Sequence, residues 1–305
     1  MIAVCISVYN GEKYLIEQFQ SIENQSLQSE YIFVIDDHST DNSRVVIQEL
    51  IEKTNLPIMY SANKFNMGIK QSYNSLLNQA LLLPIKYFMF CDQDDIWHQD
   101  KIAKTYQKMV QLEKIYGENM PILIHSDLVV TDRNMATISQ SFWKYQNIDP
   151  AKDNLNRLLL HNVVTGCTMM INQALAEKVK MIPDEAIMHD WWIAMVASTL
   201  GKIAYIDEPL MLYRQHEKND TGAKQYGLKY FVKKIFAKPS FEKYIVQSKA
   251  FLELYGKELN ECDRKMLDEF SALDKLNKYQ KLKVLFEYKI WKNGFMRNLG
   301  LILFT

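Results

Sequence analysis

The amino-acid sequence predicts an α/β protein, Rossmann-like, with a mixed, mostly parallel sheet flanked by helices and a helical C-terminal extension. Three observations predict it. In the first half, short β-rich apolar runs alternate with stretches of helical periodicity, which is typical of parallel strands joined by helical crossovers. Polar residues follow these apolar runs at their carboxyl ends. From about residue 224 onward, the sequence is helical in periodicity, aromatic and rich in lysine.

The expected elements alternate along the chain. Strands are predicted at residues 2–9, 31–36, 56–62 and 86–92. Each is followed by a predicted helix, at residues 12–25, 42–54, 69–83 and 100–116. A strand at 121–132, a helix at 189–201 and a strand at 202–214 complete the first part. The alternation argues for parallel strands with right-handed helical crossovers.

The chain is globular in composition and divides by charge. With 48% hydrophobic and 12% aromatic residues it can bury a sizeable core. Lys plus Arg and Asp plus Glu number 36 each, but residues 221–305 hold 17 Lys/Arg against 9 Asp/Glu, net +8, which leaves residues 1–220 at −8. The acidic first part suggests a cation site, and the basic tail suggests contact with an anionic surface.

Cysteine usage and hydropathy indicate a cytoplasmic protein. The four cysteines are scattered without a Cys-x-x-Cys pair, so the sequence indicates no zinc site, and buried thiols fit a reducing compartment. No window of about 18 apolar residues is present, and the first residues do not resemble a signal peptide. We therefore expect a cytoplasmic location, with at most peripheral contact with the inner face of a membrane.

Three carboxylates directly follow an apolar run in YFMFCDQDDIW, residues 87–97. Asp92, Asp94 and Asp95 repel one another unless something cationic lies among them. Ligands of open α/β sheets bind beyond the carboxyl ends of the strands, so we expect this cluster to face a ligand. The sequence has neither a Gly-x-Gly-x-x-Gly loop nor a Walker loop to hold a phosphate. A divalent cation, Mn²⁺ or Mg²⁺, bound by carboxylates and itself holding a diphosphate, resolves the conflict.

The segments that carry these features resemble a known family. ISVYNGEKYLIEQFQSIENQS, IFVIDDHSTDNS, NMGIKQSYN and FMFCDQDDIW are similar, in order and spacing, to the nucleotide-sugar-binding half of family 2 glycosyltransferases with the GT-A fold. HDWWIAMVAS and LMLYRQHEKNDTGA are most similar to the bacterial rhamnosyltransferases of that family. The resemblance identifies residues 1–223 as a catalytic domain and leaves residues 224–305 as a helical, basic and aromatic region without a family signature.

The resemblance implies an inverting, metal-dependent glycosyltransferase of bacterial surface polysaccharide (cell wall) synthesis. The expected donor is dTDP-rhamnose, and the expected acceptor is a glycan or a lipid-linked saccharide. A UDP-hexose donor is an alternative, as are a sugar nucleotidyltransferase and a non-catalytic glycan-binding module. A nucleotidyltransferase usually has a Gly-rich basic loop near its N-terminus, which SVYNGEKY does not supply. We expect no nucleic-acid partner, and a homodimer is one possible assembly.

The resemblance also assigns the donor site residue by residue. Expected nucleotide contacts come from Val8, Tyr9, Asn10, Asp37, Gly68, Lys70 and Asp94. Asp37 would accept a hydrogen bond from the ring N–H of a pyrimidine, and Lys70 would face the phosphates. Expected metal ligands are Asp92, Asp94, Asp95 and His216.

For the chemistry, the resemblance assigns Asp190 as the base that takes the proton of the acceptor hydroxyl. The residue before it is His189, where the family usually has Glu, so a second carboxylate is missing. Arg214, Trp191 and Trp192 are expected near the diphosphate or the acceptor. Each of these assignments has a structural alternative: histidines and tryptophans often pack in the core, and at most one of the two tryptophans would stack on a sugar.

The C-terminal region carries two amphipathic segments. Residues 226–244 place an apolar set on one helical face, with lysines elsewhere: Leu228, Phe231, Val232, Ile235 and Phe236. Residues 282–304 repeat the pattern. Such helices lie in the interface of an anionic bilayer, or they pack on the catalytic domain or a second subunit. The sequence leaves these alternatives open, and peripheral membrane contact is the one we predict.

Overall fold

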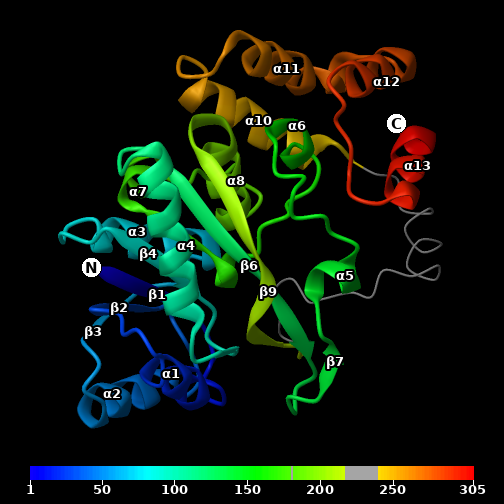
Figure 1. The fold of residues 1–305 in the computed structure, drawn as a ribbon. Coiled ribbons are helices and arrows are strands. Elements are labelled where there is room, and N and C mark those ends of the chain that lie inside the picture. The colour runs from blue at the N-terminus through cyan, green and yellow to red at the C-terminus, as the bar shows by residue number, and fades with distance from the viewer. Residues whose placement is uncertain (180, 217–239) are drawn as a thin grey trace.

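The computed structural model describes residues 1–179, 181–216 and 240–305. A central sheet lies between helices on both faces, and the last helices gather at the end of the molecule that is far from β3 (Figure 1). The strand order is β3-β2-β1-β4-β8-β6-β9-β5, with β7 attached to β6. The strands are β1 (Ile2–Val8), β2 (Tyr31–Asp36), β3 (Ile58–Ala62), β4 (Tyr87–Cys91), β5 (Ile96–Trp97), β6 (Ile122–Thr131), β7 (Thr137–Ser139), β8 (Met170–Asn172) and β9 (Lys202–Arg214).

The helices connect and cover these strands. In the catalytic part they are α1 (Leu15–Glu23), α2 (Ser43–Lys53), α3 (Ile69–Ala80), α4 (Lys101–Tyr116), α5 (Phe142–Gln146), α6 (Leu155–Leu158), the 3-10 turn η1 (Gly166–Thr168), α7 (Gln173–Val179) and α8 (His189–Leu200). The C-terminal part contains α10 (Glu242–Tyr255), α11 (Glu261–Ser271), the 3-10 turn η2 (Leu273–Lys275), α12 (Lys278–Glu287) and α13 (Phe295–Phe304).

Strand direction decides which residues meet. The strands β1 to β4 run parallel, and β8 runs antiparallel between β4 and β6. Since β6 is antiparallel to β8 and parallel to β9, two reversals return β6 and β9 to the direction of β4. The carboxyl ends of β1, β2, β4, β6 and β9 therefore share one edge of the sheet. The turn η1, which precedes β8, lies at the same edge.

The two faces of the sheet bury alternate side chains of the same strands. In β1, Ala3 and Cys5 belong to the core under α3, α7 and α8, whereas Val4 and Ile6 belong to the core under α1, α2 and α4. A strand that is buried on both faces has a continuous apolar sequence, which is why the early strands could be predicted.

The C-terminal helices belong to the first of these cores. Phe251 of α10 meets Trp192 of α8 with 5.3 Å between ring centroids, and Leu267 of α11 and Leu285 of α12 are fully buried in the same cluster. The extension is thus packed against the catalytic part. Within the described residues, every helix is too short or too polar to cross a membrane.

The predicted fold is confirmed, including the mixed sheet and the helical C-terminal extension. The short strands β5, β7 and β8 were not predicted, because runs of two or three residues carry no periodicity. Residues 226–239 of the predicted amphipathic segment 226–244 lie outside the described residues, together with the apolar set that the sequence placed there.

Candidate active site

Most of the predicted site residues lie at the shared carboxyl edge of the sheet. Tyr9 and Asn10 follow β1, Asp37 follows β2, and the three carboxylates follow β4. Arg214 ends β9, and His216 follows it. Asp190 enters from the first turn of α8, where it meets the turn η1.

The loop after β1 is locked in place by a residue that the sequence did not single out. Gln93 accepts a hydrogen bond from the Tyr9 N–H at 2.8 Å and donates one to the Tyr9 carbonyl at 3.0 Å. A Cβ on Gly11 would lie 2.3 Å from Gln93 Oε1, so only glycine fits there. The position of Gln93 between Asp92 and Asp94 is the one signal that could have revealed it.

Asn10 links the loops after β1 and β2. Its Oδ1 accepts the N–H groups of Thr40 at 2.8 Å and Asp41 at 3.3 Å, and its φ is 53°. Val8 is fully buried, so only its backbone is offered. The ring of Tyr9 is 47% exposed beside this junction, a surface on which a base can stack.

Asp37 organises the next loop. Its carboxylate, 2% exposed, accepts hydrogen bonds from Asn63 Nδ2 at 2.7 Å and from the N–H groups of Met67 and Gly68 at 2.8 Å each. Gly68 has a φ of 81°, which favours glycine. These bonds leave Asp37 little free surface, and its contact with a base stays a prediction.

Lys70 anchors the segment that leads to the predicted base. Its Nζ donates to the carbonyl of Asp184 at 2.6 Å and to that of Ala186 at 2.7 Å. The ammonium thus ties α3 to the chain just before α8 and Asp190. Its predicted contact with the phosphates is not tested by this arrangement.

The outer part of the carboxylate cluster pairs an acid with a histidine. His216 Nε2 lies 2.7 Å from Asp94 Oδ2, and the His216 ring stacks on Tyr14 with 4.9 Å between centroids. We call Asp94 and His216 the outer pair. The strands β4 and β9 are not direct neighbours, so only the folded sheet brings these side chains together.

The second part of the cluster is partly exposed at Asp92 and buried at Asp95 and Cys167. Asp92, Asp95 and Cys167 each offer a ligand atom, and these atoms lie within 4.8 Å of one another. Asp95 is fully buried and accepts the Arg214 N–H at 3.2 Å. Burial and the carboxylates of Asp94 and Asp92 raise the pKa of Asp95 well above its usual value. Burial also raises the pKa of the Cys167 thiol, so the uncharged SH form is favoured.

A buried lysine lies within electrostatic range of the carboxylate cluster without forming an ion pair with it among the described residues. Lys101 is fully buried, donates to the Cys167 carbonyl at 2.8 Å and lies 4.6 Å from the centroid of the Trp97 ring. Burial lowers its pKa to about 8, while Asp95 and Asp92 oppose the shift. We call Asp95, Cys167 and Lys101 the inner layer.

Arg214 lies at the carboxylate cluster and is buried there. The residue is 5% exposed, its Nε donates to the Asp94 carbonyl at 3.0 Å, and its guanidinium forms an ion pair with Glu17. It also lies 4.8 Å from the centroid of the Tyr14 ring. Arg214 thus holds the end of β9 against α1 and fixes the backbone of Asp94, and its contact with the diphosphate or the acceptor stays a prediction.

Asp190 has the surroundings of a general base. Its Oδ2 accepts the Gly166 N–H at 3.0 Å, and its Oδ1 accepts the Trp191 N–H at 2.6 Å. The residue as a whole is partly exposed, but its carboxylate is surrounded by protein. This burial raises the pKa of Asp190 to about 7, with a smaller contribution from the charge of Asp92. A base with a pKa near neutrality accepts and releases a proton readily at physiological pH.

His189, beside Asp190, is a buried neutral ring. Its centroid lies 4.2 Å from that of Tyr73, and burial lowers its pKa to about 3. The Tyr73 hydroxyl in turn lies 3.0 Å from Asp92 Oδ1. A Cβ on Gly166 would lie 2.7 Å from His189 Nε2, which explains the glycine at that position. His189 thus fills the space between Asp190 and the carboxylate cluster without adding charge.

The two tryptophans differ in their exposure. Trp192 is fully buried against Phe251 and Tyr255, so its predicted contact with the acceptor is wrong: no face of the ring is free to stack. Trp191 is partly exposed, and its Nε1 donates to the Leu158 carbonyl at 2.5 Å.

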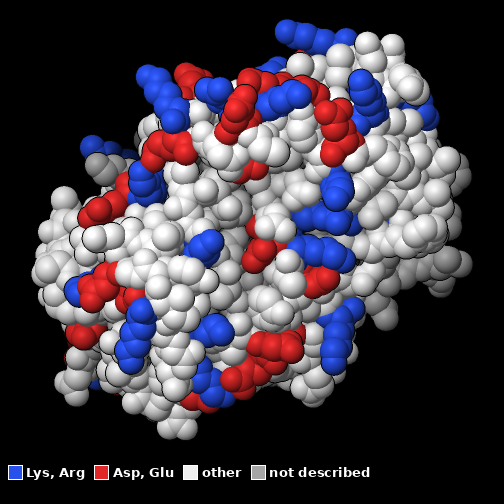
Figure 2. All heavy atoms as spheres, turned by 45° about the horizontal axis from the view of Figure 1, so that its top comes forward, with Lys and Arg blue, Asp and Glu red and all other residues white. Residues whose placement is uncertain are grey.

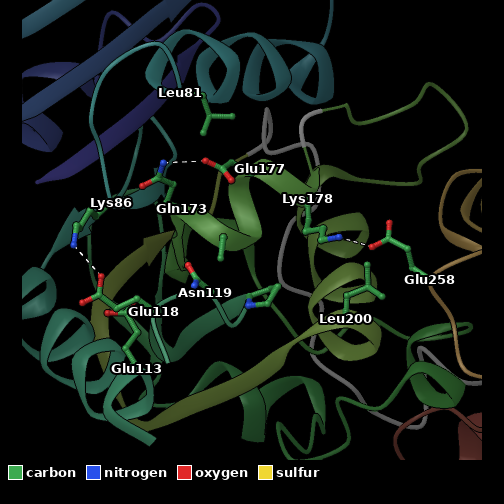
Figure 3. A pocket seen from close by; sticks show the side chains of 12 residues that line it. Leu81, Lys86, Glu113, Glu118, Asn119, Gln173, Glu177, Lys178, Leu200 and Glu258 are labelled. Carbon is green, nitrogen blue, oxygen red and sulfur yellow. Dashed lines mark hydrogen bonds and ion pairs between the residues drawn. The ribbon is translucent and has the colours of Figure 1, made fainter. Parts of the chain in front are cut away.

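A separate cavity of about 890 Å³ lies at the opposite edge of the sheet (Figure 3). Its wall includes Lys86 and Pro121, which precede β4 and β6, and ion pairs join Lys86 to Glu118 and Lys178 to Glu258. None of the predicted site residues lines it. The candidate active site is therefore the open, carboxylate-rich edge and not this cavity.

Comparison with known proteins agrees with this geometry. Residues 3–179 match the model of the family Glycosyl transferase family 2. The chain is 32% identical over 229 residues to the dTDP-rhamnosyl transferase RfbG of Shigella flexneri, covering 72% of this chain and 74% of that protein. It is 26% identical to the glycosyltransferase GlyG of Streptococcus pneumoniae, covering 70% and 71%.

Solved structures share the fold at low sequence identity. TarS of S. aureus in complex with UDP superposes with a TM-score of 0.56 at 16% identity, over 94% of this chain and 72% of that one. The mannosyltransferase PcManGT of Pyrobaculum calidifontis, in complex with GDP-Man and Mn²⁺, superposes with a TM-score of 0.54 at 13% identity, over 93% and 73%.

Proposed function

The chain belongs to glycosyltransferase family 2, and from that premise we propose an inverting, metal-dependent transfer of a sugar from a nucleotide sugar to a glycan acceptor. That it is a glycosyltransferase follows from the family. The observation that carries the mechanism is Asp190, a carboxylate with a pKa near 7 that lies at the same sheet edge as the outer pair.

The proposed donor is dTDP-rhamnose. Its support is the relative named as a dTDP-rhamnosyl transferase, because the match covers 74% of the length of that protein. A UDP-hexose is the second candidate, because a fold neighbour binds UDP. The exposed ring of Tyr9 would stack on either pyrimidine base.

The proposed cofactor is Mn²⁺ or Mg²⁺, and the donor set fits it. Asp94 and His216 offer an oxygen and a nitrogen ligand atom that lie 2.7 Å apart, and Asp92, which is partly exposed, follows the same strand, β4. Carboxylate oxygen and imidazole nitrogen are ligands that Mn²⁺ accepts. Cys167 fits less well, because its raised pKa favours an uncharged thiol and hard cations prefer oxygen. We therefore infer that Asp94, His216 and Asp92 hold the metal and that Asp95 supports them from below.

In the proposed reaction, Asp190 takes the proton of the acceptor hydroxyl while that oxygen attacks the anomeric carbon and the nucleoside diphosphate departs from the opposite face. Two backbone N–H groups, of Gly166 and Trp191, hold the carboxylate in position. Asn10, Asp37 and Gln93 fix the loops that would bind the nucleotide. When bound, the divalent cation supplies charge stabilisation for the leaving diphosphate.

The biological setting is proposed on the same grounds. We place the enzyme in bacterial surface polysaccharide synthesis, with a glycan or lipid-linked saccharide as acceptor, in the cytoplasm and in peripheral contact with the membrane through residues 224–305. A homodimer is compatible with this setting. The proposed boundary near residue 223 separates the family-like part from the C-terminal helices that pack on it.

A donor panel tests the proposal. The purified protein is incubated with dTDP-rhamnose, UDP-glucose, UDP-galactose and GDP-mannose in the presence of Mn²⁺, and in parallel with EDTA, and release of nucleoside diphosphate is measured. We expect the fastest release from dTDP-rhamnose and loss of release with EDTA. Preference for a UDP-hexose would reject the donor, and EDTA-insensitive release would reject the metal. Synthesis of a nucleotide sugar from a triphosphate would favour a nucleotidyltransferase, and binding without release would favour a glycan-binding module.

A further inference from the structure

We propose that α12 and α13 form a surface that docks on a bilayer containing anionic lipids. This surface, the α12–α13 face, consists of Tyr279, Lys283, Phe286, Phe295 and Leu303, which are all exposed. It lies entirely within the described residues. The proposal rests on the proposed function only for its purpose, since a lipid-linked acceptor is found at a membrane; lipid binding itself requires no sugar transfer.

The outward stripe of α12 is aromatic and basic. Tyr279, Lys283 and Phe286 have the spacing i, i+4, i+7, so they lie on one side of the helix. Val284 and Leu285 are buried on the opposite side, which fixes which way the stripe faces. Tyr279 is 79% exposed and Phe286 is 56% exposed, so this side of the helix presents two aromatic rings to the solvent.

α13 leaves part of its apolar surface uncovered. Its sequence FMRNLGLILF has one charged residue, and among its described side chains only Leu301 is buried. Phe295, 78% exposed, begins the helix, and Leu303 lies near its end. Arg297 fastens the helix to the catalytic part by donating to the carbonyls of Gln146 at 2.7 Å and Asn147 at 3.1 Å.

The two helices are held together and keep one orientation. Lys278, the first residue of α12, donates from Nζ to the Leu303 carbonyl near the end of α13 at 2.9 Å. The apolar end of α13 therefore lies beside the start of α12 and its exposed Tyr279. The combined face projects from the end of the molecule where Figure 1 draws the chain terminus.

The charge of the residues around the α12–α13 face indicates which kind of surface binds to it. Residues 278–305 contain six Lys/Arg and one Asp/Glu, whereas residues 240–277 contain six Lys/Arg and eight Asp/Glu. In Figure 2 the right side of the molecule, over α12 and α13, is mostly white with blue side chains, and the red ones gather further left. Aromatic rings flanked by lysines are typical of a helix that lies in an anionic lipid interface, where each surface Lys or Arg contributes about fivefold to partitioning.

Vesicle flotation of the full-length protein tests the inference. Vesicles of phosphatidylcholine are compared with vesicles that also contain phosphatidylglycerol, in low and high salt. We expect flotation only with phosphatidylglycerol, and a decrease in high salt because the charges are screened. Binding that is equal for both vesicle types, or absent from both, would overturn the proposal.

Variants assign the binding to the face. Tyr279→Ser combined with Phe295→Ser should weaken partitioning by about tenfold or more, and Lys283→Gln alone should weaken it by about fivefold. The matched controls are Leu82→Ser with Ile115→Ser, exposed apolar residues elsewhere that are 84% and 69% exposed, and Lys257→Gln with Lys275→Gln. Both controls should float like the parent protein.

The mass of the protein in solution, measured by light scattering, distinguishes lipid binding from dimerisation through the same face. If the parent is a dimer that the aromatic pair of substitutions makes monomeric, and no variant changes flotation, the face is an interface between two copies and the lipid proposal is wrong. Donor hydrolysis, measured on the same preparations without vesicles, should be unchanged in all variants. A loss of hydrolysis without a loss of flotation would therefore concern the proposed function and not this surface.

Discussion

Asp94 and Asp95 are neighbours in the sequence, yet they belong to regions of opposite character. Asp94 lies at the open side of the sheet edge, 2.7 Å from His216. Asp95 faces the interior, where it is fully buried near Cys167 and Lys101. Both residues lie in the turn between β4 and β5, which directs their side chains to different surroundings, so adjacency in a motif does not imply a shared task. The outer pair has the donors for a metal, whereas the inner layer compensates buried charge.

This difference assigns function to the outer pair and stability to the inner layer. Buried carboxylates cost free energy unless cationic groups and hydrogen bonds compensate them. Here Lys101 supplies the cation and the Arg214 N–H supplies a hydrogen bond. Each side chain of the outer pair keeps a small exposed fraction, 11%, through which a metal with its diphosphate would reach one carboxylate and one imidazole. Substitutions in the outer pair should therefore lower sugar transfer, whereas substitutions in the inner layer should lower the free energy of unfolding.

The largest effect is expected at the outer pair. Asp94→Asn and His216→Ala should each lower sugar transfer by at least about 10³-fold, because several kcal/mol of charge stabilisation on the leaving diphosphate would be lost. Thermal unfolding should stay close to that of the parent. Calorimetric titration with Mn²⁺ and the nucleotide should show the affinity gone. Unchanged affinity in both variants would remove these residues from the metal site.

Asp95→Asn is the matched change on the inner side. We expect affinity for Mn²⁺ with nucleotide to stay within about threefold of the parent value. If Asp95→Asn instead abolished the metal dependence as Asp94→Asn does, the distinction between the outer pair and the inner layer would collapse.

The next effect concerns stability. Lys101→Met keeps the bulk of the side chain but leaves Asp92 and Asp95 without their buried cation, so the free energy of unfolding should fall by about 3 kcal/mol. Denaturant unfolding measures it. In the double variant with Asp95→Asn most of the loss should be recovered, since the uncompensated charge is gone. A loss that is merely additive would show that Lys101 stabilises through packing on Trp97 instead.

Asp190→Asn should lower turnover by at least about 10²-fold while donor affinity is retained, because only the proton transfer is removed. Since the carboxylate must be ionised to accept a proton and its pKa is raised to about 7, turnover of the parent should fall as pH drops below 7. Steady-state rates across pH values check both statements. A change confined to donor affinity would make Asp190 a binding residue.

Stability provides a second readout for the same residue. A folded-state pKa above the unfolded value of 3.8 means that the stability associated with the protonated form is lost as pH rises from about 4 through 7. Asp190→Asn does not ionise and escapes this loss. The variant should therefore unfold at a higher temperature than the parent at pH 8, with a smaller difference at pH 5. Equal differences at both pH values would contradict the raised pKa.

Much of the fold could be predicted from the sequence because the early strands are buried on both faces and leave continuous apolar runs. The carboxylates of residues 92–95 could be placed at the sheet edge for the same reason, since they directly follow β4. His216 was predicted only through the family resemblance, and the structure brings it to Asp94. Those two facts together made the outer pair predictable.

The inner layer could not be predicted, because it depends on the short antiparallel strand β8. The three residues of β8 show no periodicity, yet the strand carries the turn with Gly166 and Cys167 to the active-site edge. Lys101 begins α4, and no local pattern in the sequence indicates that it is buried. The burial of Trp192 and Arg214 depends on partners far along the chain, Phe251 and Glu17, which local patterns do not specify.

The smallest effect is expected at Gln93, which lies between the two regions in sequence and touches neither a donor nor a metal ligand directly in our proposal. Gln93 makes two hydrogen bonds to the backbone of Tyr9, and Gly11 leaves room for it. Gln93→Ala should free the loop that presents the Tyr9 ring, so the KM for the donor should rise by about tenfold with little change in kcat. The matched control is Gln48→Ala on α2, an exposed glutamine that bonds only to Glu52. Because the bonds of Gln93 hold a loop and not the core, thermal unfolding of both variants should resemble that of the parent. A fall in kcat at constant KM would place Gln93 with the chemistry at Asp190, and a fall in the unfolding temperature alone would place it with the inner layer.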